Sequence, residues 1–161
     1  MFKVNKLTDY ATVVLIDMAI SGLIRPTQAI SENTGIPLPT VAKLMKHLVK
    51  SGLVASHRGV RGGYSLSRPA DQTTIADVIE AVEGPIALTA CVDTSEEHCS
   101  YEKLCPASGK WNRVNSAVTG ALRDVTLAEM ITDLEITGHV FPPDNTSSVG
   151  DATTVQSEQV S

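Results

Sequence analysis

Three cysteines, Cys91, Cys99 and Cys105, lie within fifteen consecutive residues of a chain of 161 residues. An odd number of thiols cannot all pair within one chain. The residues after Met1 also lack the apolar run and cleavage site of a secretory signal. The sequence therefore predicts a cytoplasmic protein whose clustered thiols bind a metal, since disulfide frameworks belong to oxidising compartments.

The spacing of the three cysteines bears on which metal they would bind. Structural zinc usually takes about four protein ligands and favours cysteines roughly two to four residues apart. The gaps here are seven and five residues, and such wider loops suit a larger inorganic core held by thiolates, an iron–sulfur cluster. His98 and Glu102 are neighbouring nitrogen and oxygen donors. A zinc site and three unrelated cysteines are the alternatives.

Positive charge is concentrated in the first part of the chain. Residues 1–70 contain nine Lys or Arg and three acidic residues, a net charge of +6, within a chain whose net charge is −5. Residues 71–161 contain four basic and fifteen acidic residues, a net charge of −11. This asymmetry is typical of a protein with one polyanion-binding half. Random drift of surface charge is the alternative.

The basic half is expected to contain three helices and a hairpin. Apolar residues at helical spacing predict a first helix that ends at Ser21-Gly22, and Thr27 caps a second helix that stops at Gly35. Pro39 opens a third helix that ends at Gly52. Its core face consists of Val41, Leu44, Met45, Leu48 and Val49, and its outward face consists of Thr40, Lys43, Lys46, His47 and Lys50.

Two short extended runs, 53–57 and 64–67, flank a glycine-rich tip that carries Arg58 and Arg61, and they predict a hairpin. Together with the helices, this is the order of a winged helix-turn-helix. The third helix would enter the major groove, and the arginines would reach the adjacent backbone or minor groove. The lysines would supply affinity through counterion release, whereas Thr40, Lys43, His47 and the arginines would discriminate bases. A solvated lysine face is the alternative, and it leaves the basic hairpin unexplained.

The second half is expected to hold the metal and a partner. A helix capped at Thr73-Thr74 connects residues 1–70 to a cysteine loop at 91–106, and a helix that begins near Ala107 follows. This long helix has an apolar seam stepping 3-4-3-4, which suits pairing with another helix. The seam consists of Trp111, Val114, Val118, Ala121 and Val125. A capping box at Thr126 opens a last short helix, and residues 137–161 have the composition of a disordered tail.

These elements predict a mainly helical fold: a winged helix-turn-helix at 1–70, a connecting helix at 71–90, and a dimerisation helix with a short helix after it at 107–136. No apolar run approaches the roughly 18 residues of a membrane helix. No nucleophile motif or phosphate-binding glycine loop is present, so we expect neither an enzyme nor a small-molecule substrate.

The chain resembles the Rrf2 family of bacterial transcription regulators, which includes IscR-type and NsrR-type iron–sulfur repressors. The resemblance covers about residues 1–136, and residues 105–115 resemble members that regulate SUF iron–sulfur assembly operons. The matching segments are LTDYA at 7–11, ISENTGI at 30–36, the wing at 53–66 with its Arg-Gly and Gly-Gly-Tyr, the three cysteines, and VTLAE at 125–129.

This resemblance implies a homodimer on a pseudo-palindromic, double-stranded DNA operator and a cluster held by Cys91, Cys99 and Cys105. IscR-type members use a histidine as fourth ligand where Ser108 stands here, whereas NsrR-type members use an aspartate at the position of Asp9. We therefore expect Asp9 of the partner subunit to be the fourth ligand. The first two cysteines are two residues farther apart than in the IscR-type pattern, which leaves 2Fe–2S and 4Fe–4S clusters both open.

The expected function is transcriptional repression of iron–sulfur assembly genes in response to cluster status. A repressor of the same family that responds to nitric oxide or redox state is one alternative, because Asp9 is shared with that branch. A zinc-stabilised DNA-binding or interaction protein without a sensing role is the other.

Overall fold

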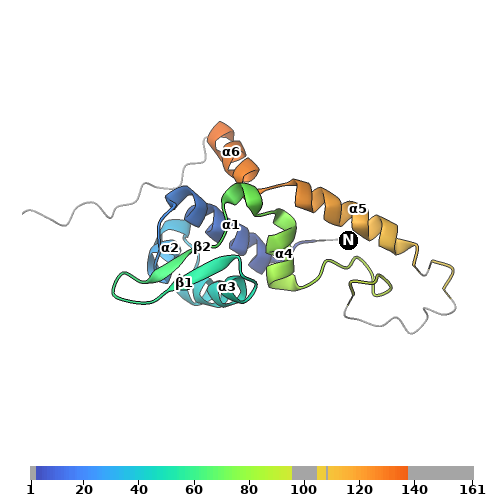
Figure 1. Cartoon of the computed structure of the whole chain (residues 1–161), viewed down its shortest axis with the longest axis horizontal. Helices are drawn as coiled ribbons and strands as arrows, with labels where there is room; N and C mark the ends of the chain where they lie inside the picture. The colour runs from blue at the N-terminus through green and yellow to red at the C-terminus, as the bar shows by residue number, and fades with distance from the viewer. Residues whose placement is uncertain (1–2, 96–104, 108, 138–161) are drawn as a thin grey trace, which may run out of the picture.

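The computed structural model describes residues 3–95, 105–107 and 109–137, which form a mainly helical fold with one two-stranded antiparallel hairpin (Figure 1). The elements are α1 (Lys6–Ser21), α2 (Thr27–Thr34), α3 (Leu38–Lys50), β1 (Val54–His57), β2 (Gly63–Leu66), the 3-10 turn η1 (Ala70–Gln72), α4 (Ile75–Glu83), α5 (Trp111–Asp124) and α6 (Leu127–Thr137). The predicted fold class is therefore confirmed. The predicted tail lies outside the described residues, apart from Thr137.

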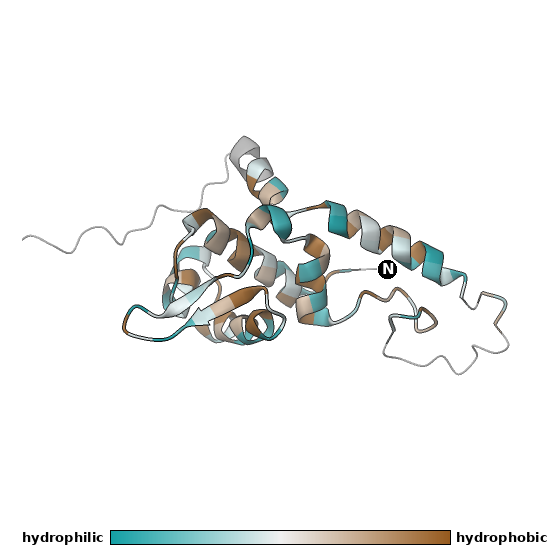
Figure 2. Cartoon of the chain, in the orientation of Figure 1, coloured by the Kyte–Doolittle hydropathy of each residue, from teal (hydrophilic) through white to brown (hydrophobic). Residues whose placement is uncertain are grey.

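The core lies between α1, α3 and α4, and Leu127 at the start of α6 completes it. Its members are the apolar residues that recur at three- and four-residue steps along α1 and α3, such as Val14, Leu15, Leu44 and Leu48, which are fully buried. Figure 2 shows brown, hydrophobic residues recurring along the helices, while much of the hairpin tip is teal.

In the first three helices, two predicted helix starts and one predicted core residue need correction. Gly22 and Gly35 end α1 and α2 in the left-handed conformation that glycine adopts at little cost. The cap of α2 is Pro26, because Thr27 is already the first helical residue. Helix α3 begins one residue earlier than predicted, at Leu38 after Pro37. Val49, predicted to be buried, is 37% exposed.

The hairpin forms a wing that is tied to the helices by its second strand. Val54 pairs with Leu66 and His57 with Gly63. Strand β1 therefore begins one residue later than the predicted run 53–57, and β2 begins and ends one residue earlier than the predicted run 64–67. Arg25, in the connection between α1 and α2, exchanges two backbone hydrogen bonds of 2.8 Å with Tyr64. This isolated bridge ties β2 of the wing to the connection between α1 and α2.

The start of α4 is linked to the junction of α5 and α6. Thr74 caps α4 in a capping box with Asp77. The Ile75 N–H donates to the Val125 carbonyl and the Leu127 N–H donates to the Thr73 carbonyl, each at 2.9 Å. From this junction α5 extends away from α1–α3 (Figure 1).

Two predictions about the ends of the last helices have different outcomes. The capping box at Thr126 is confirmed, since its N–H donates to Glu129 at 2.8 Å and the Glu129 N–H donates back to its hydroxyl at 3.3 Å. Helix α5 begins at Trp111 and not near Ala107. Gly109 has φ +70°, which a right-handed helix cannot accommodate, so the helix begins after it.

Substitution of Gly63 is expected to destabilise the wing. A Cβ there would lie 2.5 Å from the Arg25 carbonyl oxygen and 2.8 Å from the Pro26 nitrogen, both backbone atoms. We expect Gly63→Ala to lower the free energy of unfolding by about 1–3 kcal/mol, measured by urea denaturation. The matched control is Gly120→Ala, whose Cβ meets nothing within 4 Å. Equal stability of the two variants would contradict the close packing of the wing.

Candidate DNA interface and cysteine loop

Helix α3 has one buried face and one basic face. Val41, Leu44, Met45 and Leu48 are fully buried, and they hold the helix against the core. On the other side Lys43, Lys46 and Lys50 are exposed, and Thr40 and His47 are partly exposed. All five predicted DNA-facing residues of α3 thus lie on its accessible side.

The wing arginines lie at the accessible tip of the hairpin. Arg58 and Arg61 are exposed, and Val60 between them is fully exposed as well. Within the described residues, neither they nor the three lysines of α3 form an ion pair with a carboxylate. This basic surface is therefore available to phosphates, which is the arrangement that long-range attraction to DNA requires.

A buried polar link that sequence reasoning missed holds the wing to the helices. Asp17 of α1 is 2% exposed, and it pairs with Arg25 at 4.0 Å and accepts a hydrogen bond from the Asn33 side-chain amide. Since the backbone of Arg25 pairs with Tyr64, this link joins α1, α2 and β2. The signal was present in the sequence: an aspartate on the apolar face of an otherwise hydrophobic helix.

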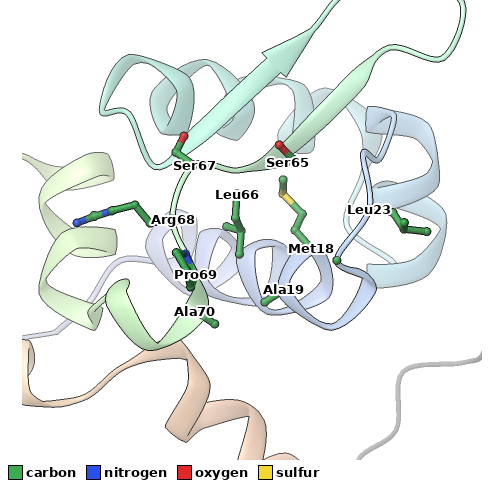
Figure 3. A pocket seen from close by; sticks show the side chains of 10 residues that line it. Met18, Ala19, Leu23, Ser65, Leu66, Ser67, Arg68, Pro69 and Ala70 are labelled. Atoms are coloured by element: carbon green, nitrogen blue, oxygen red, sulfur yellow. The ribbon is translucent and has the colours of Figure 1, made fainter.

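Between the end of α1 and the segment from β2 to η1 lies a hollow of about 380 Å³. Met18 and Leu66 point into it, and Arg68 at its edge turns toward α4 (Figure 3). Arg68 is the one charged residue of its lining, and it pairs with Asp77 at 3.2 Å. The lining therefore contains no acid and base pair that could perform catalysis.

Residues 84–110 join α4 to α5 and contain the predicted loop at 91–106, and from here on this whole connection is called the cysteine loop. Cys91 and Cys105 are free, partly exposed thiols on this loop, and the Cys91 sulfur lies 3.2 Å from the Thr89 hydroxyl. Cys99, His98, Glu102 and Ser108 lie outside the described residues. Within the described part of the chain, no three His, Cys, Asp or Glu side chains are close enough together to hold a metal ion.

Asp9 lies in the first exposed turn of α1, where it lines a hollow with Lys3 and Lys6. A side-chain hydrogen bond with Tyr10, one helical turn further along α1, raises the pKa of Lys6. The described residues of a single chain do not bring Asp9 together with Cys91 and Cys105 in one group of metal donors.

Glu83, at the end of α4, is a second residue that sequence reasoning missed. Its carboxylate accepts hydrogen bonds from the Asn5 N–H at 3.1 Å and the Thr8 hydroxyl at 2.5 Å. It also lines a hollow with Pro85, Ala87–Ala90 and Ser95, in the first part of the cysteine loop. The beginning of the loop is therefore connected to the beginning of α1.

The apolar seam of α5 is accessible in the single chain. Trp111, Val114 and Val125 are 40–45% exposed, Ala121 is exposed, and Val118 is partly exposed. Large apolar side chains at these levels of exposure, repeated along one line of a helix, form a surface suited to another apolar face. No helix in the described residues is long and apolar enough to cross a lipid bilayer.

The chain is similar to known transcriptional regulators over most of its length. The family model for Rrf2, described as an iron-dependent transcriptional regulator, matches residues 4–133. IscR of Cronobacter sakazakii is 35% identical over 130 residues, covering 79% of this chain and 78% of that protein. IscR of Klebsiella pneumoniae is 33% identical over 129 residues, covering 79% and 78%.

Solved structures agree with the sequence matches. The global cysteine regulator CymR of B. subtilis has a TM-score of 0.62 at 26% identity, covering 83% of this chain and 98% of that one. IscR of T. potens has a TM-score of 0.63 at 26% identity, covering 86% and 93%. These relatives are regulators and not enzymes, in agreement with the prediction. The basic α3 face, the wing and these matches together show that the chain is a DNA-binding transcriptional regulator of the Rrf2 family.

Proposed function

We propose that this regulator is a cytoplasmic homodimer that binds an iron–sulfur cluster and represses iron–sulfur assembly (SUF) genes according to cluster status. The observation that carries the proposal is the position of two free, partly exposed thiols, Cys91 and Cys105, on the loop between α4 and α5. This loop connects the helix that packs on the DNA-binding core to the helix with the exposed apolar seam. A change in the loop can therefore alter how two cores are held relative to each other.

In the proposed complex, α3 enters the major groove and the wing follows the adjacent backbone. The residues that contact DNA are Thr40, Lys43, Lys46, His47 and Lys50 of α3 and Arg58 and Arg61 of the wing. Two observations support this assignment: these side chains lie on a common accessible side, and none of their lysines or arginines forms an ion pair with a described carboxylate. Two copies would present two such surfaces to half-sites about one helical turn apart.

The proposed cluster ligands are Cys91, Cys99 and Cys105, with Asp9 of the partner subunit as the fourth. The donor set suits iron and sulfide, because thiolates are the usual ligands of such clusters and the two described thiols are unpaired. When bound, the cluster supplies redox-active iron. A carboxylate is a harder ligand than a thiolate, so the iron held by Asp9 would exchange more readily than iron held only by thiolates. Asp9 is exposed, and the described residues of one chain do not group it with Cys91 and Cys105, which supports a ligand from the other subunit.

The decisive experiment is anaerobic purification of the full chain followed by visible spectroscopy and assays for iron, acid-labile sulfide and zinc. We expect a coloured protein that contains iron and sulfide. A colourless protein with stoichiometric zinc would overturn the sensor proposal and favour a zinc-stabilised regulator.

Removal of one thiol is expected to abolish cluster binding. Because each thiolate is one of three, Cys91→Ala, Cys99→Ala and Cys105→Ala should each reduce iron and sulfide to background after reconstitution. Circular dichroism and light scattering should show folded dimers, since none of these thiols belongs to the described core.

The fourth ligand is tested in the same assay. Asp9→Asn should lose iron to a chelator faster than the control Asp124→Asn, which removes an exposed acid at the end of α5. Normal iron and sulfide in a cysteine variant would remove that residue from the ligand set. Equal rates for the two aspartate variants would remove Asp9.

Loss of a wing arginine is expected to weaken DNA binding through phosphate contacts. Arg58→Ala should lower affinity for a duplex selected by the wild-type protein and reduce the slope of log affinity against log salt by about one. Fluorescence anisotropy at several salt concentrations measures both. The charge-matched control is Arg113→Ala on α5, outside the basic surface. An unchanged slope for Arg58→Ala would exclude a phosphate contact at this position.

A charge in the seam of α5 is expected to separate the subunits. Val114 is 45% exposed in the single chain, and a pair of lysines facing each other in a dimer would be desolvated and mutually repulsive. Val114→Lys should therefore raise the dimer dissociation constant at least about tenfold, measured by analytical ultracentrifugation. The control is Ser116→Lys, which adds the same charge off the seam. Equal dissociation constants for the two variants would place the dimer interface elsewhere.

A further inference from the structure

One buried polar side chain of α5 holds the cysteine loop. Asn115 is 6% exposed, and its amide nitrogen donates to the Ile86 carbonyl at 2.9 Å while its amide oxygen accepts from the Leu88 N–H at 2.9 Å. The hydroxyl of Thr94 donates to the same Ile86 carbonyl at 2.9 Å and lies 3.4 Å from the Asn115 nitrogen. A single amide thus fixes the backbone of the loop just before Cys91.

A second asparagine, one helical turn earlier, fixes the loop after Cys91. The Asn112 oxygen accepts from the Asp93 N–H at 3.0 Å, and its nitrogen donates to the Asp93 carboxylate at 2.9 Å. Residues three apart lie on the same face of a helix, so both asparagines point to the loop. Cys91 is therefore bracketed by two attachments to α5.

The two attachments differ in strength because they differ in burial. The Asn112 contacts are exposed, so water can replace them. The bond from Asn115 to the Ile86 carbonyl is buried, and Ile86 also packs with Ala76 and Ile79 of α4. A buried donor or acceptor that loses its partner carries the full penalty of desolvation. An amide supplies a donor and an acceptor on two separate atoms, and this position uses both.

We propose that Asn115 is a positioning residue that couples the arrangement of the cysteine loop around Cys91 to α5, and so to the relative position of the DNA-binding cores. This inference rests on the proposed function, since it assigns the route by which cluster status reaches DNA. A loop held to α5 before and after Cys91 cannot rearrange without breaking these bonds or shifting α5. Without Asn115, the loop before Cys91 can rearrange and α5 need not move with it.

The test combines hydrogen exchange of the cluster-free protein with DNA affinities measured for the protein with and without its cluster. Hydrogen exchange, followed by NMR on the cluster-free full chain, should show the Leu88 amide exchanging at least about tenfold faster in Asn115→Ala than in wild type. The ratio of DNA affinities with and without cluster, on a duplex selected by the wild-type protein, should fall about tenfold toward unity. Iron and sulfide per chain should stay at the wild-type level.

The control is Ser116→Ala, which changes an exposed neighbour on α5. Its exchange and its affinity ratio should match wild type. Should Asn115→Ala fail to fold, Asn115→Leu provides the same test, because a side chain of the same branched shape fills the site while both the acceptor for the Leu88 N–H and the donor to Ile86 are lost.

The outcomes separate this inference from the function on which it rests. If wild type responds to its cluster and the Asn115 variant responds equally, the coupling role of Asn115 is overturned while the sensor proposal stands. An unchanged rate of Leu88 exchange overturns it as well. If wild type holds no cluster, or binds DNA equally in both states, the sensor proposal fails and the coupling fails with it.

Discussion

The arrangement of the molecule depends on the short backbone pairing between the start of α4 and the junction of α5 and α6. Two hydrogen bonds of 2.9 Å join Ile75 to Val125 and Leu127 to Thr73, and the Leu127 side chain is fully buried in the core of the DNA-binding helices. One end of α5 is thereby fixed to that core, so the helix extends outward with its seam exposed (Figure 1). The cysteine loop must then return from the far end of α5 to α4. The thiols consequently lie on the one segment that spans both elements.

The second constraint is the buried link of Asp17, Arg25 and Asn33, which sets the wing against the helices. Burial of a charged pair is expensive, and apolar residues of similar size are often at least as stabilising. Here the side chain of Arg25 forms the pair with Asp17, while its backbone joins the wing at Tyr64. The orientation of Arg25 therefore affects how the tip carrying Arg58 and Arg61 lies relative to α3. DNA contact by both elements at once requires this relation to be constant, and an apolar contact without direction would define it less well.

Local order was predictable to a large extent, because it is encoded within one or two helical turns. Gly35, the capping box at Thr126 and the buried face of α3 follow from spacing and end chemistry. The errors are also local: Thr27 competes with Pro26 for the cap, and Val49 lies at the edge of the apolar stripe of α3. The contacts of Glu83 with Thr8 and of Asn115 with Ile86 cross 75 and 29 residues. No short-range pattern specifies such pairs, so the groups that hold the candidate site together were invisible to sequence reasoning.

The contacts of Glu83 and of Asn115 near the cysteine loop offer two routes for a signal. At its start Glu83 contacts Asn5 and Thr8, which leads directly into α1 of the same DNA-binding core. The bond from the Asn5 N–H to Glu83 is exposed and the bond from the Thr8 hydroxyl is partly buried. At Asn115 the bond to the Ile86 carbonyl is buried and the bond from the Leu88 N–H is partly buried. Asn115 holds residues of the loop itself, whereas Glu83 belongs to α4, so a rearrangement near Cys91 acts on α5 more directly than on α1. Since α5 carries the seam, such a loop acts on the spacing between two cores more than on the shape of either one.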